Sequence, residues 1–313
     1  GPEPLEPAEI TTLDLDDLGA AIDRPARSLL RDRLGVRLPS SRELPDANLD
    51  LWPDNLDMAL LGNDAIDALR NGQSLDEWRT TRALRGGLPP ARLGDTALES
   101  VAREVQSMVI AAGLTLADFE IMHLDSTTNG LTIHSAVPVY GDTVLELKYV
   151  RPHPHLRLIP WLRLAALTLH DADRDWLARL VLRGDKNDSP PSVTEFAICG
   201  NSADERRQNA TRVLETLHDL RQRALRAPVP FFRRLSWTYL GTEDGKPEDD
   251  FNKDLNDRWT AWCIGATTFE ELQAEPPTAL EYGLPVHSSR AGCYALALTS
   301  CWDKTTVSIG AGK

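Results

Sequence analysis

The chain has 313 residues, of which 42% are hydrophobic and 26% charged, and it carries a formal net charge of −13 at pH 7. This composition suits one large globular domain or two smaller ones, each with a hydrophobic core. The negative charge argues against an autonomous nucleic-acid-binding protein, because affinity for phosphate comes from lysine and arginine. No apolar run has the length of a transmembrane helix, and the four cysteines lack C-x-x-C spacing, which predicts a cytoplasmic protein with free thiols.

Composition and periodicity divide the sequence into four segments. Residues 1–9 open with Gly-Pro, which is typical of a protease cleavage site, and predict a disordered lead on a chain cut from a larger protein. Residues 10–113 predict a helical layer, and residues 114–230 predict a β-sheet with helices. Residues 231–313 form an aromatic and acidic part, which is expected to pack with the rest as one compact unit.

Helical periodicity runs through the first third of the chain. Helices are expected over residues 56–70, 74–84 and 95–112, and Ser74 with Glu77 predicts a capping box at the start of the second. The third of these helices is amphipathic, and the three together predict a helical layer.

Two further helices precede them. The first is expected to begin with Thr12 as its N-cap. The second spans residues 24–34, with Pro25 in its first turn and Gly35 after its last. Its polar face carries candidate DNA contacts, for which an ordinary solvated surface is the alternative: Arg24, Arg27, Arg31 and Arg33.

The apolar period changes from 3.6 to 2 near residue 114. Alternation near residue 121 and in the runs on either side of the turn at residues 140–142 predicts a three-stranded meander. Glu146 and Lys148 project from the same face of the last strand. Such a pair can hold Mg²⁺ and orient a water molecule in a nuclease, whereas a solvated charge pair is the alternative.

A nuclease site needs a second carboxylate, and the sequence has no Asp or Glu between Asp125 and Asp142. An active Mg²⁺-dependent nuclease that uses Glu146 and Lys148 with one of these two residues therefore stays as an alternative. His123 and His134 lack a third partner at ligand spacing, so no metal site is predicted. Glycine-rich phosphate loops are also missing from the sequence, so no cofactor is predicted.

The middle of the chain completes the predicted sheet. A helix is expected over residues 155–170, strands over residues 176–183 and 193–200, and a long helix from Ser202 to about residue 226. This order predicts an α/β fold with a mixed β-sheet flanked by helices, beside the N-terminal helical layer. A second group of candidate DNA contacts precedes the first of these helices: Arg151, His153, His155 and Arg157.

Aromatic residues concentrate after Pro230, before an expected acidic loop over residues 243–257. Aromatic side chains are enriched at the centres of interfaces, and an acidic loop can steer a basic partner. A partner interface is therefore predicted, with core packing and base stacking as alternatives. Its candidates are Phe231, Phe232, Trp237 and Tyr239. A helix over residues 288–302 and a frayed tail are expected to follow.

Five phrases, in order along the chain, resemble the C-terminal domain family of RecC, the gamma chain of exodeoxyribonuclease V. They are RPARSLLRDRLGVRL at residues 24–38, GLPP with LG at residues 87–94, VYGD at residues 139–142, the helix over residues 156–169, and APVPF at residues 227–231. Trp237 departs from the family phrase, and the end beyond Ser300 does not align with it.

The resemblance implies a restriction-endonuclease-like fold, similar to the RecB nuclease domain of PD-(D/E)xK type, that has lost its catalytic residues. It implies a non-catalytic structural and docking domain of a RecBCD-type helicase–nuclease in double-strand break repair, which supports strand separation and guidance. The implied partners are RecB-like and RecD-like subunits and single- and double-stranded DNA, without a membrane. Glu146 and Lys148 would then be remnants of a nuclease site or a coincidence. A stand-alone regulator is the remaining alternative.

Overall fold

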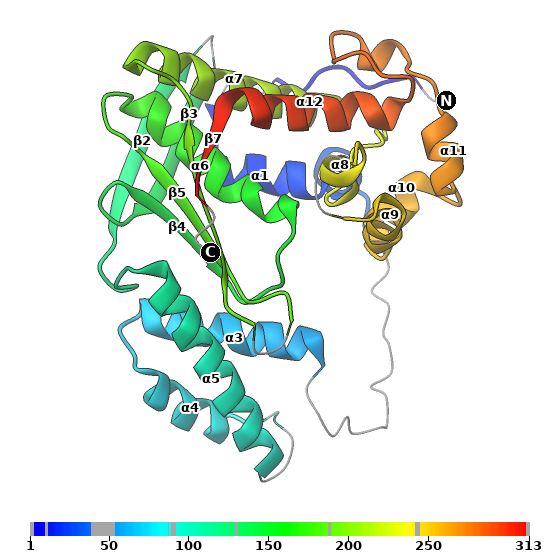
Figure 1. The fold of residues 1–313 in the computed structure, drawn as a ribbon. Helices are drawn as coiled ribbons and strands as arrows, with labels where there is room; N and C mark the ends of the chain where they lie inside the picture. Colours follow the sequence, from blue (N-terminus) through cyan, green and yellow to red (C-terminus); the bar gives the residue numbers. More distant parts are fainter. Residues whose placement is uncertain are drawn as a thin grey trace.

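The computed structural model describes residues 3–9, 12–38, 54–86, 88, 92–128, 131–186, 189–241 and 245–310. Helices surround two small mixed sheets (Figure 1). One sheet has three strands in the order β1-β3-β2, and the other has four in the order β4-β5-β6-β7. The predicted α/β class, with mixed β-structure flanked by helices, is confirmed.

The elements have the following bounds. The strands are β1 (Thr12–Leu13), β2 (Glu120–Thr128), β3 (Leu131–Val139), β4 (Thr143–Lys148), β5 (Leu177–Leu182), β6 (Ser192–Ile198) and β7 (Thr306–Gly310). The α-helices are α1 (Leu15–Asp23), α2 (Pro25–Arg27), α3 (Asn55–Arg70), α4 (Leu75–Leu84), α5 (Arg92–Ala112), α6 (Leu158–His170), α7 (Ala203–Ala224), α8 (Leu235–Thr238), α9 (Pro247–Leu255), α10 (Arg258–Ile264), α11 (Phe269–Ala274) and α12 (Arg290–Thr305). A π-helix, η1 (Ser28–Arg33), continues α2, and two 3₁₀ turns are η2 (Pro154–Arg157) and η3 (Ala279–Glu281).

The predicted three-stranded meander is wrong. Strand β2 pairs antiparallel with β3, but β4 leaves β3 after the turn and pairs in parallel with β5. The turn itself is present, because Tyr140 and Thr143 exchange backbone hydrogen bonds of 2.8 and 3.1 Å and Gly141 has a φ of 59°. All four inner residues of β4 are buried, so this strand needs a helical layer on each of its faces.

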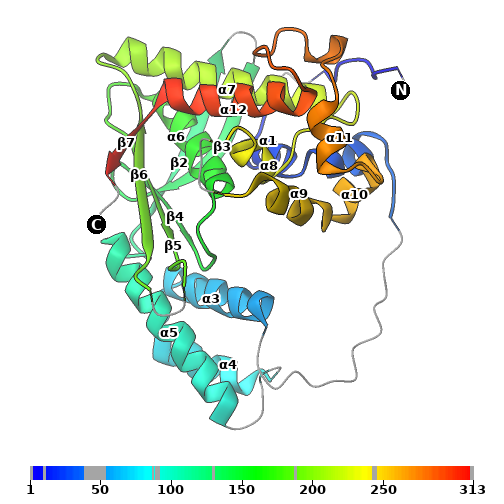
Figure 2. The same cartoon turned by 45° about the vertical axis from the view of Figure 1, so that its right-hand side comes forward.

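The four-stranded sheet has a hydrophobic cluster on each face. Val144, Ala178 and Phe196 face the cluster built by α1, α6, α7 and α12. Leu145 and Val181 face the second cluster, which comes from α3, α4 and α5. Figure 2 shows α7 and α12 side by side over one part of the sheet, with α3 to α5 at its other end.

Helix α6 lies between the two sheets and contacts strands of both. Its sequence, LIPWLRLAALTLH, is almost entirely apolar, and nine of its 13 residues are buried. Trp161 is 0% exposed and lies edge-on to Trp237 and Trp302, with ring centroids 6.3 and 5.1 Å apart. Helix α6 therefore lies at the centre of the protein.

The helices of the first third follow their predicted spans with one correction. The capping box of Ser74 and Glu77 is confirmed, as is the helix that begins at Pro25 and ends before Gly35. Thr12 is not the N-cap of α1, because it belongs to β1 and pairs with Thr132. Asp14 takes that role, and its Oδ1 accepts hydrogen bonds from the amides of Asp16 and Asp17 at 2.8 and 3.0 Å.

Both ends of the described chain are more ordered than their sequences predict. Leu5 and Arg226 exchange hydrogen bonds of 2.8 and 2.9 Å, so residues 3–9 lie along the end of α7 instead of being disordered. The expected frayed tail is strand β7, which pairs with β6. The expected acidic loop over residues 243–257 contains α9, whereas residues 243 and 244 lie outside the described residues.

Tyr149 connects the helices α3 to α5 to the end of β4. Its backbone amide donates to Asn63 Oδ1 at 3.0 Å, and its hydroxyl donates to Glu104 Oε2 at 2.8 Å. The Arg183 guanidinium lies 4.8 Å from the centre of the ring. Gly62 of α3 leaves the space that the ring fills, since a Cβ there would lie 2.0 Å from Tyr149 Cγ.

Candidate functional site

Glu146 lies on β4 with its carboxylate turned toward α6 and only 8% of the residue exposed. Lys148 Nζ is 2.9 Å from Glu146 Oε1, so the predicted placement of both side chains on one face is confirmed. Arg163 of α6 donates from Nη1 to Glu146 Oε2 at 3.0 Å. Each carboxylate oxygen is thus engaged by a cation.

Arg163 was not predicted from the sequence as part of this site. Its Nη2 also lies 3.5 Å from Asp16 Oδ1, which extends the ion-pair cluster from β4 through α6 to α1. Arg163 is the only cation that interrupts the apolar run from Leu158 to Leu169, and that interruption is the signal that could have found it. Arg163 is partly buried, with 21% of its side chain exposed, and a cation removed this far from water favours an anionic partner.

The two carboxylates considered as a second metal ligand lie elsewhere. Asp125 is on β2, in the three-stranded sheet, where its Oδ1 lies 3.5 Å from His134 Nδ1. Asp142 forms an ion pair with Arg174. Within the described part of the chain, no group of three or more His, Cys, Asp or Glu side chains is arranged to hold a metal ion, and His123 lies exposed on β2.

Three of the four arginines predicted as DNA contacts come together. They line an open groove of about 590 Å³, which we call the arginine groove: Arg24, Arg27, Arg31, Asn256, Asp257, Arg258 and Trp259. One wall is formed by α2 and η1 and the other by the start of α10. Arg33 turns away, and its Nη2 donates to the carbonyl of Glu6 at 3.0 Å.

The second group of predicted DNA contacts separates. Arg151 is exposed, whereas the Arg157 guanidinium lies 5.3 Å from the centre of the Trp302 ring. His155 is 5% exposed, and the His153 side chain is 10% exposed. The DNA-contact prediction is wrong for these two histidines, because the layer that contains α8 and α9 covers them.

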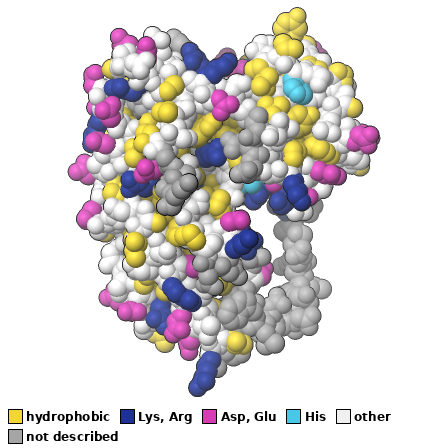
Figure 3. Space-filling view, viewed as in Figure 1, with side chains coloured by type: hydrophobic (Ala, Val, Ile, Leu, Met, Phe, Trp, Pro, Cys, Tyr) yellow, Lys and Arg dark blue, Asp and Glu magenta, His cyan; other side chains and the backbone are white. Residues whose placement is uncertain are grey.

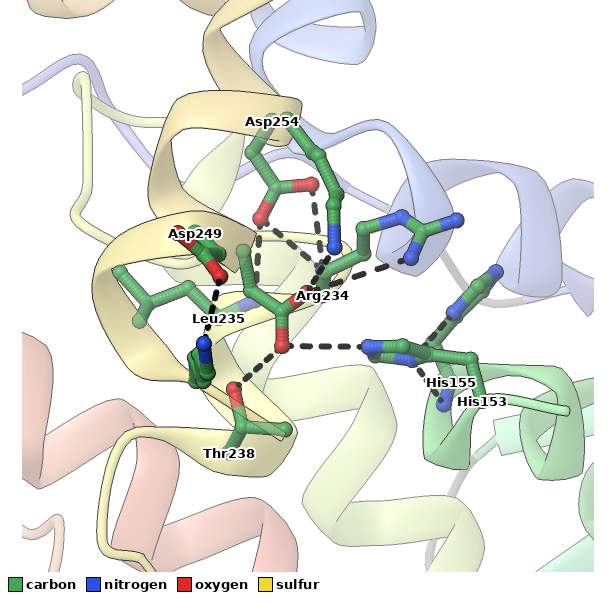
Figure 4. A network of polar contacts seen from close by, with 10 residues as sticks. His153, His155, Arg234, Leu235, Thr238, Asp249 and Asp254 are labelled. Carbon is green, nitrogen blue, oxygen red and sulfur yellow. Dashed lines mark hydrogen bonds and ion pairs between the residues drawn. The ribbon is translucent and has the colours of Figure 1, made fainter. Parts of the chain in front are cut away.

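The two histidines belong to a buried polar network with α8 and α9 (Figure 4). His155 Nδ1 lies 2.7 Å from His153 Nδ1, and His153 Nε2 lies 3.2 Å from Asp250 Oδ2. Thr238 donates to the same oxygen at 3.0 Å. Asp254 accepts from the backbone amide of Leu235 at 2.9 Å and thereby caps the start of α8.

Burial sets the protonation of this network. It lowers the pKa of both His153 and His155, since a charged imidazole would lose its hydration. Burial raises the pKa of Asp254 to about 6. Burial also opposes ionisation of Asp250, but the hydrogen bonds from His153 and Thr238 outweigh it, so its pKa lies below the ordinary value.

We expect the free energy of unfolding to decrease when the pH is lowered from about 7 to about 6. His153 and His155 bind protons more readily in the unfolded state, so protonation near the ordinary pKa of 6.5 favours unfolding. Below about pH 6 the raised pKa of Asp254 acts in the opposite direction, because the folded state then binds the extra proton. Melting temperatures measured across this pH range test how the stability changes with pH.

His155→Phe is expected to reduce this pH dependence. The matched control is His134→Phe, since His134 is exposed on β3 and its side chain is 54% accessible. If the melting temperatures of the wild type and His155→Phe changed equally with pH, the buried imidazole of His155 would not contribute to the pH dependence of stability.

The aromatic residues predicted as a partner interface form part of the core. Phe231, Phe232 and Trp237 are each 3% exposed, and Tyr239 is partly buried with its hydroxyl 2.8 Å from Ser289 Oγ. The prediction of an exposed interface at the first three is therefore wrong, and core packing is the correct alternative. Among the described residues of this region, two large aromatic side chains are exposed: Trp262 on α10, at 64%, and Tyr282 after η3, at 86%.

The surface shown in Figure 3 carries basic and acidic side chains interspersed with hydrophobic ones. This pattern agrees with the net charge of −13, since no basic tract dominates that face. Among the residues that the structure describes, none of the helices has both the length and the apolar character needed to span a membrane.

Comparison with known proteins places most of the chain in one family. The family model RecC_C, described as the RecC C-terminal domain, matches residues 10–244. No curated protein sequence matches the chain significantly. RecC is a subunit of the RecBCD complex, exodeoxyribonuclease V, which acts on DNA in repair together with RecB and RecD. With the match covering more than half of its residues, the chain belongs to the RecC C-terminal domain family.

Proposed function

We propose that this chain is a non-catalytic structural and docking domain of a RecBCD-type helicase–nuclease in double-strand break repair. The observation that carries the proposal is the state of Glu146, whose two carboxylate oxygens are held by Lys148 and Arg163 at 2.9 and 3.0 Å. The same residues would be the remnant of a nuclease site of PD-(D/E)xK type.

The electrostatics of Glu146 oppose metal binding. Mg²⁺ prefers octahedral oxygen coordination, in which a protein supplies one or two carboxylates and water or phosphate oxygens complete the shell. Two cations already neutralise this carboxylate, and a unit charge at about 4 Å repels another by about 4 kcal/mol at an effective dielectric constant of 20. The repulsion of a divalent ion would be larger still. The Arg163 guanidinium thus replaces the metal as the partner of Glu146.

In the proposed role the domain acts through its shape and its partners. RecB-like and RecD-like subunits dock on it, and it supports strand separation and guidance inside the assembled complex in the cytoplasm. The packing of the protein supports this role, since α6 contacts both sheets and hydrogen bonds of Tyr149 connect the helices α3 to α5 to the end of β4.

The purified chain is expected to cleave neither single- nor double-stranded DNA in the presence of Mg²⁺ or Mn²⁺. Arg163→Ala removes one cation from Glu146 and Asp16, but Lys148 still holds Glu146 Oε1, so this variant is also expected to be inactive. Product formation on gels tests both proteins, and copurification with RecB-like and RecD-like subunits tests docking. Metal-dependent cleavage that disappears in Glu146→Gln would establish the active nuclease instead, and failure to copurify would exclude the docking role.

A further inference from the structure

We infer that the arginine groove binds single-stranded nucleic acid, with Trp262 as a stacking platform beside it. The inference rests on the proposed function, because it names the DNA that a domain of this complex would contact. It adds residues that the family match does not include, since Arg258, Trp259 and Trp262 lie beyond residue 244.

The wall formed by α2 and η1 presents a row of cations. Arg24, Arg27 and Arg31 are three and four residues apart, and this spacing places them on one side of a helix. The acidic neighbours are Asp23, 3.8 Å from Arg24, and Asp32, 2.6 Å from Arg31. The Arg31 pair is exposed, and in the Arg24 pair the arginine is exposed while Asp23 is partly buried and also holds Arg233 at 2.7 Å. Water and salt therefore weaken both pairs, and phosphate can compete for the two guanidinium groups.

Arg27 differs from its two neighbours. Among the described residues, it makes no ion pair or hydrogen bond, although its backbone lies between theirs. A guanidinium group presents a fork of N–H donors that matches the oxygens of a phosphate. Arg27 is thus available to an anion in the groove without first breaking a contact within the protein.

The opposite wall adds a fourth arginine, Arg258 at the start of α10. The single carboxylate in the groove lining, Asp257, is the N-cap of α10 and is turned to the Trp259 amide and the Thr260 hydroxyl, each at 3.4 Å. The lining therefore carries four arginines against one aspartate on a chain that is acidic as a whole.

The two walls are held together by apolar contacts behind the groove. Helix α2 packs against α10, and Pro25, Ala26 and Leu29 of the first wall line one narrow pocket with Cys263 and Ile264 of the second. Pro25 and Leu29 are buried, and Ala26, Cys263 and Ile264 are partly buried. The spacing between the arginines on the two walls is consequently fixed by the fold before any ligand binds, which lowers the cost of binding.

Trp262 identifies the class of ligand. It lies four residues after Arg258, one turn further along the same side of α10, and 64% of it is exposed. Trp259 of the same helix is buried, at 8% exposed. A phosphate chain with aromatic bases uses both features of this surface, the guanidinium groups and the open indole ring. An acidic peptide would use the arginines and leave the indole in water.

Binding is tested with the 313-residue chain and a fluorescent oligothymidylate of about 16 nucleotides. We expect weak, salt-sensitive binding, with a slope of log K against log salt of about −2 to −3 for three or four phosphate contacts. Arg27→Glu with Arg258→Glu is expected to weaken binding at least about tenfold and to flatten the slope. Trp262→Leu is expected to weaken it several-fold and to remove most of the quenching of tryptophan fluorescence.

Two matched controls separate this site from general surface effects. Arg85→Glu reverses a charge whose side chain is 64% exposed at the end of α4, at the opposite end of the molecule from α10 (Figure 1). Tyr282→Leu removes an aromatic that is 86% exposed. Both variants are expected to bind as the wild type does, and losses equal to those of the groove variants would overturn the inference.

A competition experiment decides between the two classes of macromolecule. Polyglutamate is added at the same concentration of negative charges as the oligonucleotide. If it displaces the oligonucleotide and Trp262→Leu does not weaken oligonucleotide binding, the groove is a site for acidic peptide and the inference is wrong. The outcome is independent of the nuclease assay. A chain that lacks binding at the groove can still be a non-catalytic docking domain, and a chain that cleaves DNA can still bind it at the groove.

Discussion

Replacing Trp161 with alanine is expected to reduce the free energy of unfolding by about 3–5 kcal/mol. The side chain is 0% exposed and contacts Trp237 and Trp302 at the centre of the protein. Removing it deletes a large apolar surface and leaves a cavity between α6, α8 and α12, which these helices cannot close without moving. Urea denaturation followed by circular dichroism gives the change.

Two further variants sharpen this result. Trp161→Phe is expected to cost less, because the indole Nε1–H is buried without a hydrogen-bond partner among the described residues and phenylalanine removes it. Trp262→Ala is the control, because it makes the same substitution at a residue that is 64% exposed. It is expected to change the free energy of unfolding by no more than about 0.5 kcal/mol. Similar losses for Trp161→Ala and Trp262→Ala would contradict the placement of α6 at the centre.

Gly62→Ala is expected to destabilise the protein although alanine is the better helix former. The intrinsic preference of a helix for alanine gives about 1 kcal/mol. Against it, the new Cβ would lie 2.0 Å from Tyr149 Cγ and 2.3 Å from Cδ1. The ring cannot move aside easily, because Asn63 and Glu104 hold Tyr149 by hydrogen bonds. Overpacking of a core costs about 1–3 kcal/mol or more, so a net loss is expected in thermal unfolding.

Gly19→Ala is the matched control in α1. Its Cβ would meet Ile159 Cδ1 at 2.5 Å, which is the end of a flexible side chain and can rotate away. The stabilisation from the helix preference for alanine then offsets the cost of the contact, and a change in the free energy of unfolding close to zero is expected. If Gly62→Ala were as stable as Gly19→Ala, Tyr149 would not be fixed between α3 and β4.

The elements that could be predicted are those whose signals are local. Helices α3, α4 and α5 show apolar residues at helical spacing, and α4 carries its own capping box. The pairing of β4 could not be predicted, because alternation assigns the faces of a strand but not its neighbour. Proximity along the chain favoured β3, whereas α6 occupies the space between the two sheets and β4 pairs with β5.

The candidate sites show the same limit. The common face of Glu146 and Lys148 follows from a spacing of two residues, but Arg163 reaches them from another element. His153 and His155 read as polar surface residues in the sequence. They are buried because α9 covers them, and their partner Asp250 lies 97 residues from His153 along the chain. Burial that depends on such distant segments leaves no pattern near the residue itself.

The pairing of β7 with β6 has a consequence for how the protein is made. Thr306 is the partner of Ile198, more than 100 residues earlier, and α12, which covers Phe196 with Trp302, immediately precedes β7. A ribosome adds about 5–20 residues per second, so the outer edge of β6 waits about 5–20 s for its neighbour after it has been synthesised. During that interval the edge offers unpaired backbone groups to other nascent chains. Slower translation of the segment between them would lengthen this exposure and is expected to increase aggregation during synthesis without changing the stability of the finished protein.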